Sequence, residues 1–135
     1  MSASKILLVH YDPTALQRFR SILETHGFEV SEARDGSAAV AAMLETEPDL
    51  ILMEAMLPKV HGFEVCEDIK KTGAGRKTPV VLMTTVYKGR KYRNEALHDH
   101  GADEYIELPM EDTKFVAVIE RSLKNGSGAP SSTPA

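Results

Sequence analysis

Polar side chains that could bind a ligand or take part in a reaction stand in this sequence where apolar runs end. Three apolar runs end at such residues: the first at His10, Tyr11 and Asp12, the second at Glu54 and the third at Thr84. Further along, the pair Leu108-Pro109 follows a fourth short run and is included with them. A histidine and carboxylates that are held together can bind a metal ion or a small polar ligand. Their chemistry therefore depends on whether the fold brings the ends of these runs to one place.

Two of these residues allow two interpretations each. Pro13 follows Asp12, and proline fits the first turn of a helix, so the Asp12 carboxylate is better placed as a helix cap than as a metal ligand. His10 beside Glu54 would form a pH-sensitive ion pair if it were protonated. The alternative for His10 is a neutral, buried side chain that fills space.

Alternating strands and helices position these residues. Short apolar runs predict strands over 5–9, 28–32, 50–53, 79–84 and 104–107. Apolar residues at helical spacing predict helices over 13–26, 37–46, 63–71, 89–100 and 112–124, with a break at Gly73-Ala74-Gly75 before the fourth strand. This alternation predicts a doubly wound (βα)₅ α/β fold with a five-stranded parallel sheet. Binding sites in such folds lie at the carboxyl ends of the strands, where the polar residues are expected to gather.

Length and composition are typical of one globular domain. The chain has 135 residues, of which 42% are hydrophobic and 27% charged. We expect the domain to cover 1–124 and the Gly/Ser/Pro-rich segment 125–135 to form a flexible tail or linker. One cysteine, Cys66, excludes an internal disulfide framework and a thiolate zinc site. Since no apolar stretch is long enough for a signal peptide or a membrane span, the sequence predicts a soluble, cytoplasmic protein.

A run of cations without any acidic residue lies between Ile69 and Asn94, although the net charge of the chain is −4. Half of the 16 Lys and Arg residues stand there, with two tyrosines among them. They are Lys70, Lys71, Arg76, Lys77, Tyr87, Lys88, Arg90, Lys91, Tyr92 and Arg93. The part near the predicted fourth helix favours docking of an acidic protein surface, with an ordinary solvated helix face as the alternative. The negative total charge and the division of the cations between two connections disfavour nucleic acid.

The sequence resembles the receiver domain of bacterial two-component response regulators over about residues 4–124. The matching stretches are 5–9, 48–53, 56–58 with 62–66, 79–84, and 101–105 leading to Pro109. The resemblance implies a flavodoxin-like receiver fold and a cis peptide before Pro109. It also implies that Thr84 and Tyr105 form a switch, and that the fourth helix, fifth strand and fifth helix form the surface for a protein partner or a homodimer.

The chemical positions of a receiver are changed here. The phosphoryl-accepting aspartate corresponds to Glu54, the acidic pair that holds Mg²⁺ to His10 and Tyr11, and the neutralising lysine to Leu108. Mg²⁺ needs oxygen ligands, and phosphoryl transfer needs charge neutralisation by a metal and a cation. We therefore expect weak or no magnesium binding, no other cofactor and no enzymatic activity. The sequence predicts a degenerate pseudo-receiver that binds a protein partner without phosphorylation.

Two other functions stay open at this point. One is an atypical response regulator that is still phosphorylated, and the other is a small-ligand or metal sensor that uses the modified pocket. Glu54 is one methylene longer than aspartate, so its carboxylate either reaches toward Thr84, which would hold the switch activated, or points into water. The predicted switch and partner surface consists of Tyr87, Lys88, Arg90, Lys91, Tyr92, Arg93 and Tyr105.

Overall fold

The five predicted strands form one parallel sheet in the order β2-β1-β3-β4-β5. A computed structural model describes residues 3–125. The strands are β1 (Lys5–Val9), β2 (Glu29–Ala33), β3 (Leu50–Glu54), β4 (Val80–Thr84) and β5 (Glu104–Glu107). β1 pairs with β2 on one side and with β3 on the other, so the strand order reverses at β1. A crevice for ligands is expected at the carboxyl ends of the strands beside such a reversal. The predicted doubly wound α/β class is confirmed.

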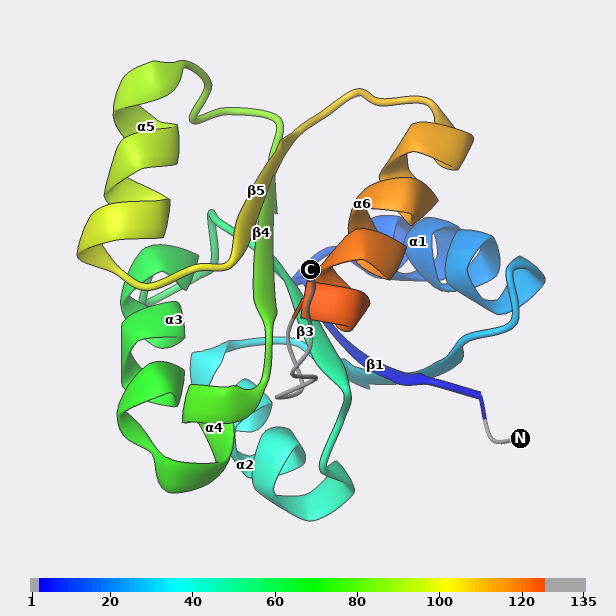
Figure 1. Cartoon of the computed structure of the whole chain (residues 1–135), viewed down its shortest axis with the longest axis horizontal. Helices are drawn as coiled ribbons and strands as arrows, with labels where there is room; N and C mark the ends of the chain where they lie inside the picture. The colour runs from blue at the N-terminus through cyan, green and yellow to red at the C-terminus, as the bar shows by residue number, and fades with distance from the viewer. Residues whose placement is uncertain (1–2, 126–135) are drawn as a thin grey trace.

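Helices cover both faces of this sheet, as Figure 1 shows. They are α1 (Pro13–Thr25), α2 (Gly36–Thr46), α3 (Gly62–Lys71), α4 (Gly73–Lys77), α5 (Arg90–Asn94) and α6 (Asp112–Asn125), with a π-helix, η1 (Glu95–Asp99), directly after α5. α1 and α6 lie side by side on one face of the sheet, and α2, α3 and α5 lie on the other. The predicted fourth helix corresponds to α5 with η1, and the predicted fifth helix to α6.

Two apolar cores result, because successive side chains of a strand point to opposite faces of the sheet. Leu7 and Ile51 belong to the core under α2, α3 and η1, whereas Leu8 and Leu52 belong to the core under α1 and α6. Every residue of β3 and β4 is buried, which explains why these strands read as continuous apolar runs. Cys66 is buried in the first core, and this burial raises the pKa of its thiol to about 12.

Two local predictions are confirmed at the ends of the elements. Asp12 caps α1: its Oδ2 atom accepts a hydrogen bond of 3.2 Å from the backbone N–H of Ala15. Pro13 occupies the first turn of that helix, where its missing N–H leaves no bond unmade. The peptide bond between Leu108 and Pro109 is cis.

The sequence prediction was wrong between α3 and β4, where a short helix replaces the expected break. The Thr72 hydroxyl accepts a bond of 2.8 Å from the N–H of Gly75 and so opens α4. A Cβ atom on Gly75 would collide with the carbonyl oxygen of Ile69. Glycine therefore serves here to let two backbones approach closely rather than to end a helix.

Two other boundaries differ from the prediction. β2 begins at Glu29 rather than at Phe28, because the Phe28 N–H donates to the carbonyl of Leu23 and so belongs to the end of α1. The predicted fourth helix is α-helical only in its first half. Its second half, η1, closes with a bond from the His100 N–H to the carbonyl five residues earlier, the spacing of a π-helix.

Two expectations concern the surroundings of the domain. Of the helices within residues 3–125, none combines the length and the apolar character that a membrane crossing requires. The tail predicted over 125–135 lies outside the described residues, except for Asn125, where α6 ends.

The close approach at α4 can be tested with two alanine substitutions in one helix. Gly75→Ala should lower the free energy of unfolding by about 1–3 kcal/mol, since the added methyl group overpacks against Ile69. Gly73→Ala is the matched control, because its Cβ would meet no atom within 4 Å. It should leave stability unchanged or raise it by about 0.4–1 kcal/mol. Urea unfolding measures both, and equal losses would show that the close approach does not matter.

Candidate functional site

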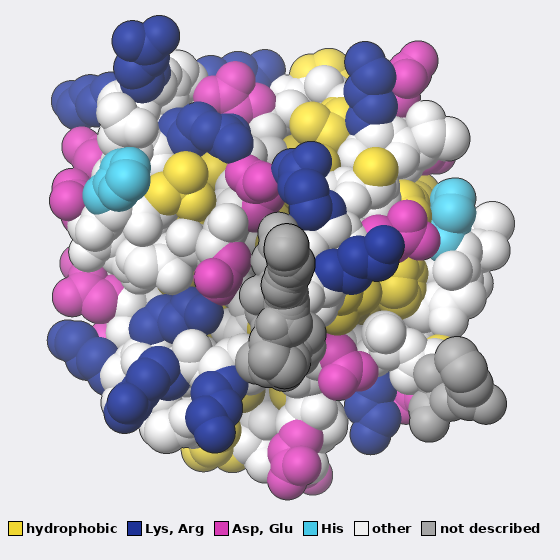
Figure 2. Space-filling model, viewed as in Figure 1, with side chains coloured by type: hydrophobic (Ala, Val, Ile, Leu, Met, Phe, Trp, Pro, Cys, Tyr) yellow, Lys and Arg dark blue, Asp and Glu magenta, His cyan; other side chains and the backbone are white. Residues whose placement is uncertain are grey.

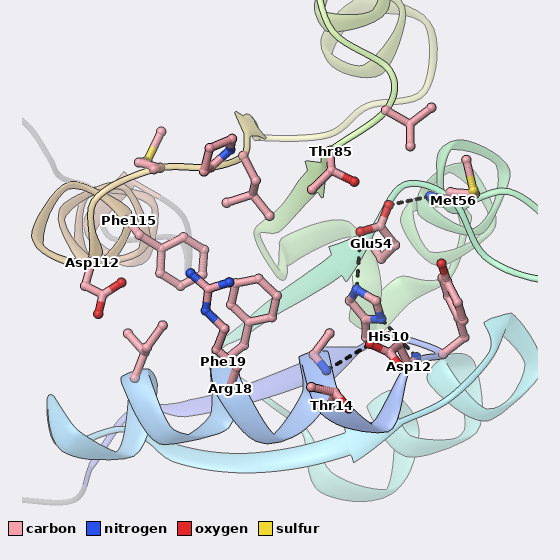
Figure 3. Close-up of a pocket in the computed structure, with 17 residues that line it drawn as sticks. His10, Asp12, Thr14, Arg18, Phe19, Glu54, Met56, Thr85, Asp112 and Phe115 are labelled. Carbon is pink, nitrogen blue, oxygen red and sulfur yellow. Dashed lines mark hydrogen bonds and ion pairs between the residues drawn. The ribbon is translucent and has the colours of Figure 1, made fainter.

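The carboxyl ends of β1 and β3 bring His10 and Glu54 together. Val9 pairs with Met53 across these strands, so the chain segments that follow emerge side by side. A cavity of about 370 Å³ opens at this edge, between α1, α6 and the connection from β5 to α6 (Figure 3). Five of the six residues predicted for the pocket line it. They are His10, Tyr11, Asp12, Glu54 and Leu108.

His10 is buried, with an exposed fraction of 7%, and both of its ring nitrogens have a neighbour. The backbone N–H of Asp12 donates to Nδ1 over 3.1 Å, so this nitrogen carries no proton and the ring proton resides on Nε2. Nε2 lies 3.4 Å from Oε1 of Glu54. His10 is therefore a neutral side chain whose N–H faces the carboxylate. His10 thus lies beside Glu54, as the first interpretation expected, but as the neutral buried ring of the second.

Glu54 is 5% exposed, and the loop after β3 covers it. Its Oε2 atom accepts a bond of 2.9 Å from the Met56 N–H, and its Oε1 atom faces His10. Both sequence interpretations of Glu54 were wrong. The carboxylate does not point into water, and within the described chain no hydrogen bond joins it to Thr84. The reason is the tight turn after β3, which brings the Met56 amide back over the end of the strand.

Thr84 lies beneath the loop formed by residues 85–89 and not in the cavity. Its hydroxyl oxygen accepts two bonds of 2.9 Å, from the N–H groups of Val86 and Tyr87. Thr85 lines the cavity instead, because neighbouring residues of a strand point to opposite faces. Sequence analysis placed Thr84 at the pocket and missed Thr85. The alternation along β4 is the signal that distinguishes them.

Tyr105 holds the same loop from β5. Its side chain is 2% exposed, and its hydroxyl donates to the carbonyl of Tyr87 over 2.5 Å. Burial raises the pKa of this phenol, so it remains a protonated donor. Glu107 adds a third attachment, since its carboxylate accepts the Gly89 N–H over 2.7 Å. The two residues of the predicted switch, Thr84 and Tyr105, thus meet through the backbone of Tyr87.

The donors at this edge do not suit Mg²⁺, which requires near-octahedral oxygen ligands. The Asp12 carboxylate caps α1, and both oxygens of Glu54 have partners. Tyr11 is 44% exposed and lies against the His10 ring, with the ring centroids 5.0 Å apart. Leu108 offers no ligand and packs in the core under α1 and α6. Over residues 3–125, no group of three or more His, Cys, Asp or Glu could hold a metal ion.

The remaining wall of the cavity consists largely of residues that sequence analysis did not assign to a site. Arg18 and Phe19 come from α1, and Asp112 and Phe115 come from α6 (Figure 3). The rings of Phe19 and Phe115 stack with their centroids 5.4 Å apart. The Arg18 guanidinium carbon lies 5.9 Å from the Phe19 ring. Only the packing of α1 beside α6 brings these residues together, so no spacing in the sequence marks them.

Arg93 and three other cations of the predicted partner surface are exposed; the three others are Lys88, Arg90 and Lys91. We call these three residues the basic corner. None of them forms an ion pair with a residue that the structure describes. Figure 2 shows Lys and Arg side chains gathered at the upper left, where Figure 1 places α5. Tyr87 and Tyr92 are half-buried beside them, with their ring centroids 5.2 Å apart.

Other cations of the same run hold the fold together. Arg93, predicted for the partner surface, donates to the Glu104 carboxylate over 2.8 Å, and Arg121 does the same from α6. Partial burial would raise the pKa of Glu104, but a backbone N–H, Arg121 and the charge of Arg93 together hold it below its ordinary value. Lys70 pairs with Asp103 over 2.8 Å. Sequence analysis grouped Arg93 and Lys70 with the cations that form no ion pair, because their partners lie elsewhere in the sequence.

The attachment of the loop at 85–89 can be tested by removing one hydroxyl group. Tyr105→Phe should cost about 0.5–1.5 kcal/mol of stability and should speed amide hydrogen exchange in the loop, because the bond to the Tyr87 carbonyl is lost. Tyr92→Phe is the control, since the Tyr92 hydroxyl has no hydrogen bond to a described residue and its ring contacts survive. Unchanged exchange in Tyr105→Phe would show that this hydroxyl does not hold the loop.

Comparison with known proteins identifies the family to which this chain belongs. Residues 6–120 match the family model of the response regulator receiver domain. The DNA-binding dual master transcriptional regulator RpaA of a Synechocystis strain is 30% identical over 126 residues, which cover 93% of this chain and 52% of RpaA. The polar-differentiation response regulator DivK of Brucella anthropi is 30% identical over 118 residues, 87% of this chain and 94% of DivK. This chain thus spans about half the length of RpaA and of several other regulators that it matches.

A solved structure agrees in fold. The signal receiver domain of a signal transduction histidine kinase from Syntrophus aciditrophicus superposes with a TM-score of 0.83 at 30% sequence identity, over 98% of this chain and 99% of that one. The family match covers most of the chain, and it contains the sheet whose carboxyl edge forms the cavity. The chain belongs to the response regulator receiver domain family of two-component signalling and has its CheY-like (βα)₅ fold.

Proposed function

We propose that this receiver domain signals without a phosphorylation cycle, catalyses no reaction of its own, and binds a protein partner through the basic corner. The observation that carries the proposal is the environment of Glu54. Its carboxylate is buried, one oxygen accepts the Met56 amide, and the other faces the neutral ring of His10. At the position that corresponds to the phosphoryl acceptor of other receivers, these contacts hold the Glu54 carboxylate against the chain itself.

The charges around Glu54 support this proposal. A carboxylate that accepts a phosphoryl group needs positive charge beside it, since transfer depends on neutralising the developing charge. Leu108 is apolar where receivers carry a lysine, and His10 is neutral because the Asp12 N–H occupies its Nδ1. The residues present do not fit Mg²⁺ either. Glu54 is therefore better suited to holding the loop after β3 than to accepting a phosphoryl group.

The basic corner supports the second half of the proposal. Its three cations are exposed, whereas the neighbouring Tyr87 and Tyr92 rings are half-buried and pack against each other, and Tyr87 also packs against Phe63. The loop that carries Lys88 is fixed by bonds from β4 and β5. A surface that is ordered before binding loses less entropy when it binds. Its chemistry fits an acidic protein surface, because opposite charges steer encounter and fix orientation.

The phosphorylation half can be tested by NMR on the full chain. Titration with Mg²⁺ and then with beryllofluoride, a phosphoryl mimic, should leave the amide signals of Glu54, Thr84 and Tyr105 in place, since this edge offers no set of oxygen ligands for Mg²⁺ and no Lys or Arg beside Glu54 to neutralise the mimic. Saturable shifts at these three residues would contradict the proposal and identify an unusual but working phosphoacceptor.

A restored variant supplies the control for that titration. His10→Asp, Tyr11→Asp, Glu54→Asp and Leu108→Lys together give the edge the residue types that receivers carry. A folded restored variant should respond to the same additions, which would show that the frame is competent and that the four side chains decide the outcome. The dispersion of its amide spectrum reports whether it folds.

The partner half can be tested by site-specific photo-cross-linking in cells that produce the full protein. A photoreactive residue in place of Lys91 should trap a protein, and Arg90→Glu should abolish the product, because reversed charge repels an acidic surface. The same residue in place of Gln17, which is exposed on α1 on the other side of the sheet, should trap none. A product made of two copies of the chain would identify the partner as a homodimer, and equal products at both positions would refute a specific surface.

A further inference from the structure

The cavity at the sheet edge has the construction of a small-molecule site. Its volume of about 370 Å³ lies near the lower end of the range of about 300–1,000 Å³ that such sites occupy. One wall is apolar and comes from α1, α6 and the β5–α6 connection. It is formed by Phe19, Ile22, Leu108, Pro109, Met110 and Phe115. The opposite end is polar and consists of His10 and Glu54, both more than nine-tenths buried (Figure 3).

Glu54 carries a negative charge that no cation of the described chain offsets. None of the ion pairs formed by Lys or Arg involves it, and its nearest basic side chain, His10, is the neutral tautomer. The distance from His10 Nε2 to the carboxylate is 3.4 Å, which is long for a hydrogen bond. A carboxylate has about four acceptor sites, and only two neighbours face it here. A buried carboxylate of this kind gains most from a charged donor.

The other charges of the cavity point the same way. Asp12, Glu54 and Asp112 are the acidic residues of its lining, and Arg18 on α1 is the one Lys or Arg among the described lining residues. A phosphate or carboxylate placed beside Glu54 would be repelled by its negative charge. The neighbouring Leu108 is apolar and supplies no cation to offset this repulsion. An ammonium group would meet a carboxylate instead. The stacked rings of Phe19 and Phe115 offer an aromatic surface for the rest of the ligand.

We propose that this cavity binds a small organic amine with an aromatic or other apolar body, the ammonium group on Glu54 and the body between α1 and α6. The ligand would supply to Glu54 the positive charge that the chain itself lacks. This inference does not rest on the partner surface at α5, and binding at the edge gives the domain an input other than a phosphoryl group.

Three probes of nearly equal size and different charge test the proposal: 2-phenylethylamine, 2-phenylethanol and phenylacetate. Each is titrated into the full chain, and amide shifts around Glu54, Leu108 and Phe115 report binding. The amine should bind roughly tenfold tighter than the alcohol or better, with phenylacetate weakest. Absence of saturable shifts for the amine at millimolar concentrations, or tightest binding by phenylacetate, would overturn the proposal.

Variants then assign the contact. Glu54→Gln should reduce the preference for the amine over the alcohol to near one, and a preserved preference would overturn the role of Glu54. If Glu54→Gln does not fold, Ala15→Leu decides the location, since Ala15 lines the cavity from α1 and a larger side chain there takes its space. Ala15→Leu should weaken binding of the amine, whereas Ala41→Leu, at an exposed residue of α2, should leave the affinity unchanged. Equal effects of the two leucines would place the amine elsewhere and refute the site.

Discussion

A carboxylate buried at the end of the central strand sets the conditions for everything near it. Removing a charged group from water is costly unless hydrogen bonds replace its hydration. Glu54 obtains one hydrogen bond from the Met56 amide, and the N–H of the neutral His10 ring faces its other oxygen at 3.4 Å. The turn after β3 must therefore run close to the strand. Gly62 allows this, because a side chain there would collide with the backbone of Glu54 and Ala55.

The same edge shows how the residue types around a carboxylate set the properties of a cavity. His10, Tyr11 and Leu108 line the cavity together with Glu54, and the carboxylate of Asp12 is turned to cap α1. None of the Lys or Arg ion pairs of the described residues involves Glu54. What is left is a cavity whose walls are mostly apolar and whose buried end is an acceptor.

A second set of contacts ties the sheet to the basic corner. Thr84 and Glu107 bind backbone N–H groups of the loop at 85–89, and Tyr105 binds one of its carbonyls. Phe63 on α3 packs its ring near those of Tyr87 and Tyr105. The loop thus connects the ends of β4 and β5 with the exposed cations.

The sequence by itself determined the architecture. Apolar runs located all five strands, Asp12-Pro13 marked the start of α1, and the residues at the strand ends identified the edge where a site would form. These predictions succeed because strand burial and helix capping depend on neighbours in the chain.

Other features of the site are visible only in the folded molecule. The folded backbone determines which ring nitrogen of His10 carries the proton and directs the Glu54 carboxylate away from both water and Thr84. It also places Thr85, and not Thr84, in the wall of the cavity. Tertiary contacts also give Arg93 and Lys70 acidic partners, whereas the cations of the basic corner form no ion pair with a described residue, and they stack Phe19 on Phe115. The ion pairs of Lys70 and Arg93 and the Phe19–Phe115 stack join residues far apart in sequence, so no local pattern specifies them. The tautomer of His10 and the direction of Glu54 depend on how the following backbone turns, which the apolar pattern does not specify either.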